Sequence, residues 1–109
     1  MRPEKFTIKL REALNTALKS ASKNENPEIT PEHFLLALLG QSDGLAKPLF
    51  EKLGVSVSSL EARLQESVSK LAKVRGAAQP QLSQELRKIL DAAEGEMAML
   101  KDDFTSVEH

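Results

Sequence analysis

The amino-acid sequence predicts an all-α protein built from two copies of one short-helix motif. Apolar residues recur every three or four positions in several segments, and no stretch alternates apolar and polar residues as a half-buried strand does. The opening of one predicted helix also recurs at the end of the chain. Residues 30–33 read Thr-Pro-Glu-His, and residues 106–109 read Ser-Val-Glu-His. These observations set the fold class and indicate an internal duplication.

The duplication extends well beyond the four-residue motif. His109 lies 76 positions after His33, and a shift of that length aligns residues 6–33 with 82–109 without a gap. Six aligned pairs are identical, where about two are expected from ordinary residue frequencies. We therefore predict one domain with a first repeat over residues 1–72, a mobile connection over 73–81 and an incomplete second repeat over 82–109.

Two helices are predicted in the first forty residues. The second of them begins after Thr30, which can cap it, with Pro31 where its missing N–H costs nothing. Residues 34–39 are all apolar, so we expect this central helix to be buried on all sides and to stop at Gly40. The first helix is predicted from an apolar stripe that ends before Pro27: Phe6, Leu10, Ala13, Leu14, Ala17 and Ala21.

Three further helices are predicted after Gly40. A short third helix ends at Gly54, and its apolar residues are Leu45, Leu49, Phe50 and Leu53. Ser56 can cap a fourth helix, whose apolar stripe is Leu60, Leu64, Val68 and Leu71. A fifth helix opens at Ser83 and carries on one face Leu86, Ile89, Leu90, Ala93, Met97 and Leu100.

The second repeat stops where its own central helix would begin. In the first repeat, the apolar residues 34–39 can pack against the stripe of the first helix. The matching stripe of the second repeat is Leu86, Leu90 and Ala93, and no residues follow to cover it. Exposing such side chains costs about 1.5–3 kcal/mol each. We therefore expect this chain to self-associate, or else to hold residues 82–109 loosely.

Composition excludes several classes of function. Apolar residues make up 40% of the chain and charged residues 28%, and the formal charge is −1. We therefore expect neither nucleic acid nor an anionic membrane as a partner. The absence of cysteine rules out a disulfide framework and a thiolate metal site. No apolar signal-peptide core follows Met1, which favours a cytoplasmic location.

The motifs together resemble the N-terminal domain of Clp ATPases, a module of two Clp repeats. The resemblance rests on the opening Phe6-Thr7, on residues 29–39 (Ile-Thr-Pro-Glu-His-Phe-Leu-Leu-Ala-Leu-Leu) and on residues 53–55 (Leu-Gly-Val). Residues 76–93 and 103–109 look most similar to the ClpB-type disaggregases. The resemblance covers essentially the whole chain, and the departure from it is the missing apolar helix of the second repeat.

The resemblance implies a mobile appendage on a hexameric, ATP-driven unfolding ring. In disaggregases such a domain engages unfolded or aggregated polypeptide, and the polar positions that matter for substrate correspond here to Thr7, Asp102 and Glu108. In protease-linked members the domain docks adaptor proteins or binds phosphorylated arginine through acidic residues of the two repeat openings. Those acidic residues correspond to Glu32 and Glu108. Both functions stay open at this point.

The candidate site residues each have a simpler explanation. An apolar stripe is usually core, but Ala92, Glu96 and Met97 could line a shallow peptide groove, since Met repacks easily against varied partners. Glu32 and Glu108 could serve only to favour their helix N-termini, by about 0.3–1 kcal/mol. Thr7 could be a helix-start residue and nothing more.

We expect a binding module with no catalytic residues and no cofactor of its own. The sequence contains no Gly-x-x-x-x-Gly-Lys-[Ser/Thr] loop, so ATP would be bound by other modules of a parent ATPase. It also contains no Gly-x-Ser-x-Gly nucleophile motif. His33 and His109 are too few for a metal site without other ligands, and packing or capping roles suit them better. The competing class is a structural piece that caps or spaces a larger assembly.

Overall fold

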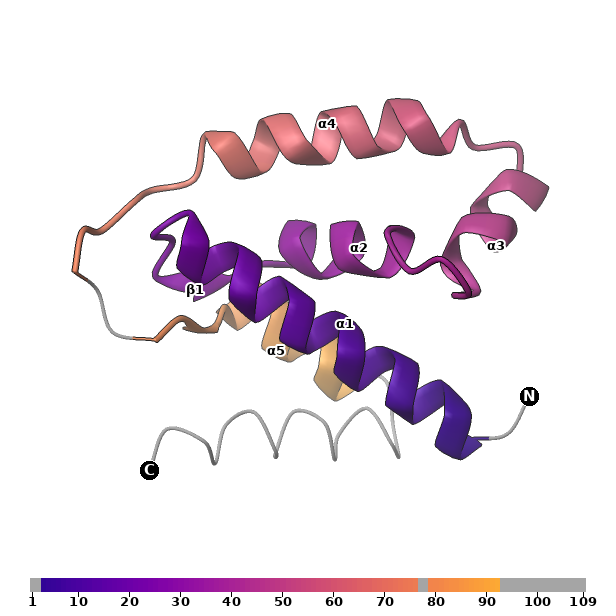
Figure 1. Ribbon diagram of the computed structural model, residues 1–109, viewed down its shortest axis with the longest axis horizontal. Helices are drawn as coiled ribbons and strands as arrows, with labels where there is room; N and C mark the ends of the chain where they lie inside the picture. The colour runs from indigo at the N-terminus through magenta and orange to yellow at the C-terminus, as the bar shows by residue number, and fades with distance from the viewer. Residues whose placement is uncertain (1–2, 77–78, 93–109) are drawn as a thin grey trace.

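The computed structural model describes residues 3–76 and 79–92, which form helices joined by short loops and one short strand pair. This confirms the predicted all-α class (Figure 1). The elements in chain order are α1 (Pro3–Lys23), β1 (Glu28–Ile29), α2 (Pro31–Leu39), α3 (Ala46–Lys52), α4 (Val57–Ser69), β2 (Gln81–Leu82) and α5 (Gln84–Ala92).

Helices α1, α3 and α4 are arranged around α2. This helix packs against both α1 and α4, and α3 turns the chain between α2 and α4. Figure 1 shows α2 and α4 running side by side, with α1 running obliquely below α2 in this view and in front of α5. The shortness of α2 and its apolar sequence suit this central place.

The main core lies between α1, α2 and α5. Four of its members are completely buried residues of α1: Ala13, Leu14, Ala17 and Ala21. The remaining members of the cluster are Leu10, Ile29, Phe34, Ala37, Leu82, Leu86 and Leu90. The apolar stripe predicted for the first helix is thus confirmed from Leu10 to Ala21. The small residues of α1 let neighbouring elements approach its backbone closely.

Two predictions about helix position and burial were wrong in part. Helix α1 begins at Pro3 rather than at Thr7, because a proline is well suited to the first helical position. Helix α2 is not buried on all sides, since Leu35, Leu36 and Leu38 are half-buried. Nine residues that pack against two flanking helices leave part of their circumference uncovered.

The predicted short third helix is present, but it contributes no buried residue. Helix α3 ends before Gly54, whose φ of 86° lies in the left-handed region that glycine adopts without strain. Leu45, Leu49 and Leu53 are 53%, 57% and 69% exposed. Helical spacing therefore predicted the helix correctly, although the side chains that set the spacing lie at the surface.

Helix α4 follows its predicted pattern. Ser56 caps it by accepting a hydrogen bond from the Ser59 backbone N–H at 3.5 Å. Val68 is buried, and the other residues of the predicted stripe are half-buried: Leu60, Leu64 and Leu71.

A parallel strand pair joins the two parts of the chain, and the sequence did not reveal it. Glu28 pairs with Gln81, and Ile29 with Leu82. Two-residue strands are too short to show alternation, so no periodicity could predict them. The pair holds the end of the predicted connection, whose earlier part is held by a bond from Val74 N–H to Glu25 O at 2.8 Å. The division into 1–72, 73–81 and 82–109 stays a prediction.

The expectation of an uncovered second stripe was wrong for the two residues of it that are described. Leu86 and Leu90 are both 0% exposed and belong to the same core cluster as Leu10 and Leu14 of α1. The reason is that β2 brings α5 directly against the core of the first repeat. Ala93 lies outside the described residues, and self-association stays a prediction.

Candidate functional site

The strand pair places the starts of α2 and α5 next to each other. Thr30 follows β1 directly and caps α2, while Ser83 follows β2 directly and caps α5. The Ser83 backbone N–H donates to Ile29 O at 3.0 Å, and the Ser83 hydroxyl accepts from the Leu86 N–H at 3.0 Å. Two positive helix ends therefore lie side by side at the junction of the two repeats.

A buried polar chain fixes the start of α2. The Thr30 backbone N–H donates to His33 Nδ1 at 2.9 Å, and Thr30 Oγ1 accepts from the His33 N–H at 3.4 Å. Together these bonds form a capping box in which histidine replaces the usual Glu or Gln. His33 Nε2 lies 3.0 Å from Asn26 Oδ1, and Asn26 Nδ2 donates to Ala72 O at 3.0 Å. His33 and Asn26 are each 2% exposed.

These contacts settle the protonation of the imidazole. A backbone N–H can only donate, so Nδ1 of His33 is the acceptor and Nε2 carries the hydrogen that Asn26 Oδ1 accepts. Burial lowers the pKa of His33 below its ordinary value of 6.5, while the negative charge of Glu32 acts in the opposite direction. The neutral ring therefore has a structural capping role, as the sequence suggested for this residue.

Glu32 lies in the first turn of α2 and is half-buried. Its carboxylate is therefore close to the positive end of the helix, as predicted. A role in ligand binding stays a prediction, and its proposed counterpart Glu108 lies outside the described residues.

The substrate-facing residues predicted for α1 and α5 are described only in part. Thr7 is the fifth residue of α1, and Ala92 is the exposed last residue of α5. Glu96, Met97 and Asp102 lie outside the described residues. The structure adds two exposed isoleucines close to them in sequence, Ile8 at 54% and Ile89 at 47%.

Sequence reasoning assigned Ile89 to the apolar face of the fifth helix without separating core from surface. Leu86 and Leu90 face the core, and Ile89 lies to one side of them. The apolar face of α5 is therefore wider than the core that covers it. The sequence of α5 alone cannot separate its buried side from its exposed side, because the separation depends on where α1 lies.

The described residues contain neither a cluster of metal ligands nor a membrane-spanning helix. Within residues 3–76 and 79–92, no group of three or more His, Asp or Glu side chains is placed to hold a metal ion. None of the helices in these ranges is long and apolar enough to cross a membrane.

Comparison with known proteins gives the family. Residues 5–109 match the model of the Clp repeat (R) N-terminal domain. The chain belongs to this family. It is similar to the chaperone protein ClpB of Mycobacterium tuberculosis (42% identical over 104 residues), of Mycobacterium leprae (39% over 104 residues) and of Porphyromonas gingivalis (35% over 104 residues).

The match covers nearly the whole chain but a small part of each relative. It spans 94–95% of this chain and 12% of each of the three relatives. The resemblance to a ClpB-like Clp repeat domain is thus confirmed, and the chain is the kind of N-terminal domain found in chaperone Clp ATPases.

Proposed function

We propose that this Clp repeat domain engages unfolded or aggregated polypeptide on behalf of an ATP-dependent disaggregase. The similar proteins are chaperones, which supports the substrate class. The proposal assigns ATP binding and hydrolysis to other modules of a hexameric parent chain. In this arrangement the domain itself carries no active site and no cofactor.

The observation that carries the proposal is the exposed apolar edge of α5. Ile89 and Ala92 are three residues apart and therefore lie on the same side of the helix. Both are exposed, and Ile89 leaves about half of its side chain in water. Shallow apolar contacts of this kind suit weak binding to many sequences, because they bury little area and require no exact geometry.

The test is a titration of the domain with a reduced and alkylated, permanently unfolded protein, followed by backbone amide chemical shifts. We expect shifts near Ile8, Ile89 and Ala92, and an affinity about fivefold weaker for Ile89→Ser, from partial loss of apolar burial. Leu49→Ser is the matched control, because Leu49 is 57% exposed on α3. Equal losses for the two variants, or shifts absent from α1 and α5, would contradict the proposal.

A second candidate function is phosphoarginine or adaptor docking, and the position of Glu32 favours it. A half-buried carboxylate beside a capped helix start could pair with a guanidinium group, while helix N–H groups donate to the phosphate oxygens. A parallel titration with a phosphoarginine peptide tests this function. Glu32→Gln should weaken that binding while leaving the melting temperature nearly unchanged, and unchanged binding would remove the candidate.

A further inference from the structure

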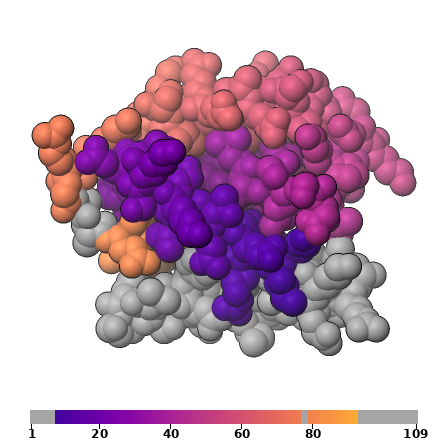
Figure 2. Space-filling model, in the orientation of Figure 1, coloured from indigo at the N-terminus to yellow at the C-terminus, as the bar shows by residue number. Residues whose placement is uncertain are grey.

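A groove runs over α2 between α1 and α4. Its volume is about 530 Å³, and its lining comes from these three helices and from residues next to them. Figure 2 shows the surface of α2 between the atoms of α1 and those of α4. No residue of α5 lines this groove, so it is separate from the apolar edge described above.

The two walls of the groove carry polar side chains at a regular spacing. Every fourth residue of each wall lines it, namely Thr16, Ser20 and Asn24 on the α1 side and Glu61, Gln65 and Ser69 on α4. Four residues of helix advance about 6 Å. Two residues of an extended chain advance about 6.6–6.8 Å. Over two such steps the mismatch is only about 1.5 Å, so each wall can offer a hydrogen-bonding group to every second residue of an extended peptide.

The floor of the groove is apolar, and two of its residues, Ala37 and Gly40, are small. It is formed by Leu36 and Ala37 of α2, by Gly40 at the C-terminal cap of α2, and by Val68 in the last turn of α4. Amide and hydroxyl groups on the walls can both donate and accept, which is what a peptide backbone requires. The groove walls are therefore suited to hydrogen-bond with the backbone of a peptide, and the floor has room for small side chains.

The two ends of the groove differ in charge. Lys73 lines one end, directly after Ala72, whose carbonyl accepts from Asn26 Nδ2. At the other end, the groove shares Thr16 and Gly40 with an adjoining cleft of about 410 Å³.

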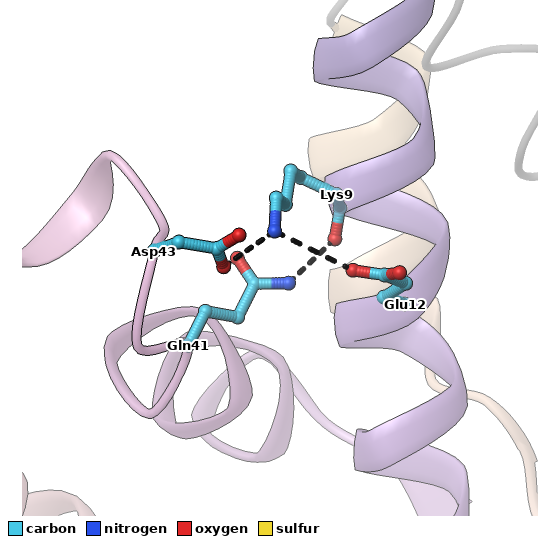
Figure 3. A network of polar contacts seen from close by, with 4 residues as sticks. All are labelled: Lys9, Glu12, Gln41 and Asp43. Atoms are coloured by element: carbon cyan, nitrogen blue, oxygen red, sulfur yellow. Dashed lines mark hydrogen bonds and ion pairs between the residues drawn. The ribbon is translucent and has the colours of Figure 1, made fainter.

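The adjoining cleft makes this second end acidic. It is lined by Glu12 and Asp43, and Glu61 lies in the main groove. Lys9 bonds to Asp43 and lies 3.9 Å from the Glu12 carboxylate, while Gln41 Nε2 donates to the Lys9 carbonyl at 2.8 Å (Figure 3). The Lys9 ammonium group is thus shared by the carboxylates of Asp43 and Glu12.

We propose that this groove binds an extended polypeptide segment that places a basic residue at the Glu61 end. The backbone of the segment pairs with the polar walls, and its basic side chain adds to the acidic end. The inference rests on the proposed function, and it adds a second binding surface that selects for positive charge within unfolded substrates.

The test uses a seven-residue peptide, acetyl-Asp-Ser-Ala-Val-Ala-Ser-Lys-amide, and the same peptide with glutamine in place of lysine. We expect amide shifts at Ser20, Gln65 and Ser69, and a two- to fivefold weaker affinity of Glu61→Gln for the lysine peptide only, the scale of an exposed ion pair. Glu66→Gln is the matched control, because Glu66 lies on α4 outside the groove lining and pairs with Lys70.

A third peptide tests whether the groove walls form hydrogen bonds with the peptide backbone. Methylation of alternate backbone nitrogens removes donors without changing charge, and it should weaken binding to the groove for both charge variants. Equal affinity of the methylated and unmethylated peptides, or an equal effect of Glu61→Gln on both charge variants, would overturn the proposal.

The outcomes separate this inference from the proposed function. If an unfolded protein changes the amide chemical shifts of only Ile8, Ile89 and Ala92, the proposal of binding in the groove is wrong and the proposed substrate role stands. If the peptide binds in the groove but the unfolded protein does not bind the domain, the proposal of binding in the groove stands and the proposed substrate role is wrong.

Discussion

His33 Nε2 and Asn26 Oδ1 lie 3.0 Å apart, and both residues are almost completely buried. The bond joins the first turn of α2 to the loop after α1, and Asn26 extends it to Ala72 after α4. One polar chain therefore ties together three segments at the end of the groove. In a small all-α domain, such a chain is a sensitive point for stability.

Stability should fall in mildly acidic solution because of His33. Its pKa is lowered in the folded state, so between that value and 6.5 the unfolded chain binds more protons. The contribution of the neutral ring is complete above pH 6.5 and is lost as the pH falls toward the lowered pKa. Urea denaturation from pH 7.5 to 5 measures this. A His33→Asn variant should show a flatter profile, and identical slopes would contradict the assignment.

Asn26→Ala should destabilise the domain by about 2 kcal/mol, because it leaves the His33 Nε2–H and the Ala72 carbonyl without their partner. Urea denaturation at pH 7.5 gives the value. Asn15→Ala is a matched control, since Asn15 is exposed on α1 and the change improves helix propensity. An Asn26→Ala loss no larger than that of the control would show that the chain of bonds is unimportant.

Glu25→Gly should stabilise the domain by up to about 1 kcal/mol. Glu25 has a φ of 59°, at the position after α1 where glycine is preferred. The Asn26 N–H donates to Ala21 O at 2.9 Å and the Glu25 N–H to Ser22 O at 3.0 Å, a Schellman ending that requires this left-handed residue. The melting temperature should rise for glycine and not for Glu25→Ala. A rise with alanine would point to charge rather than backbone strain.

The packing of α5 predicts a contrast between neighbouring residues. Leu86→Ala should cost about 2–5 kcal/mol, because Leu86 is fully buried in the main core. Ile89→Ala, at an exposed position of the same helix, should cost less than about 1 kcal/mol. Chemical denaturation of the two variants measures the difference. Equal small losses would mean that α5 contributes little to the core.

Local sequence signals predicted the helices well. The caps at Thr30, Ser56 and Ser83, the stops at Gly40 and Gly54, and the stripe of α1 all depend on neighbouring residues, so the sequence shows them directly. The repeat motif also led to the correct family, because Thr-Pro-Glu-His followed by an apolar run is distinctive.

Features that depend on distant residues were missed. The pairing of Ile29 with Leu82 has no periodic signature, and without it the burial of Leu86 and Leu90 could not be foreseen. The same limit applies to the exposure of Ile89, which depends on how α5 packs against the core, and to the groove, which depends on how α1, α2 and α4 are oriented. Of the predicted site residues, the described part of the chain places only Glu32, Ala92 and the backbone of Thr7.

The strand pair also has a consequence for the order of folding. Nearly half of the chain separates Ile29 from Leu82, whereas α1, α2 and α4 meet through short connections. Closing the longer loop costs more entropy, so the helices of the first repeat should assemble before β2 and α5 dock. On the ribosome, the core therefore lacks Leu86 and Leu90 until β2 and α5 have emerged. During that interval the nascent domain exposes the kind of apolar surface that chaperones recognise, and it resembles a chaperone client.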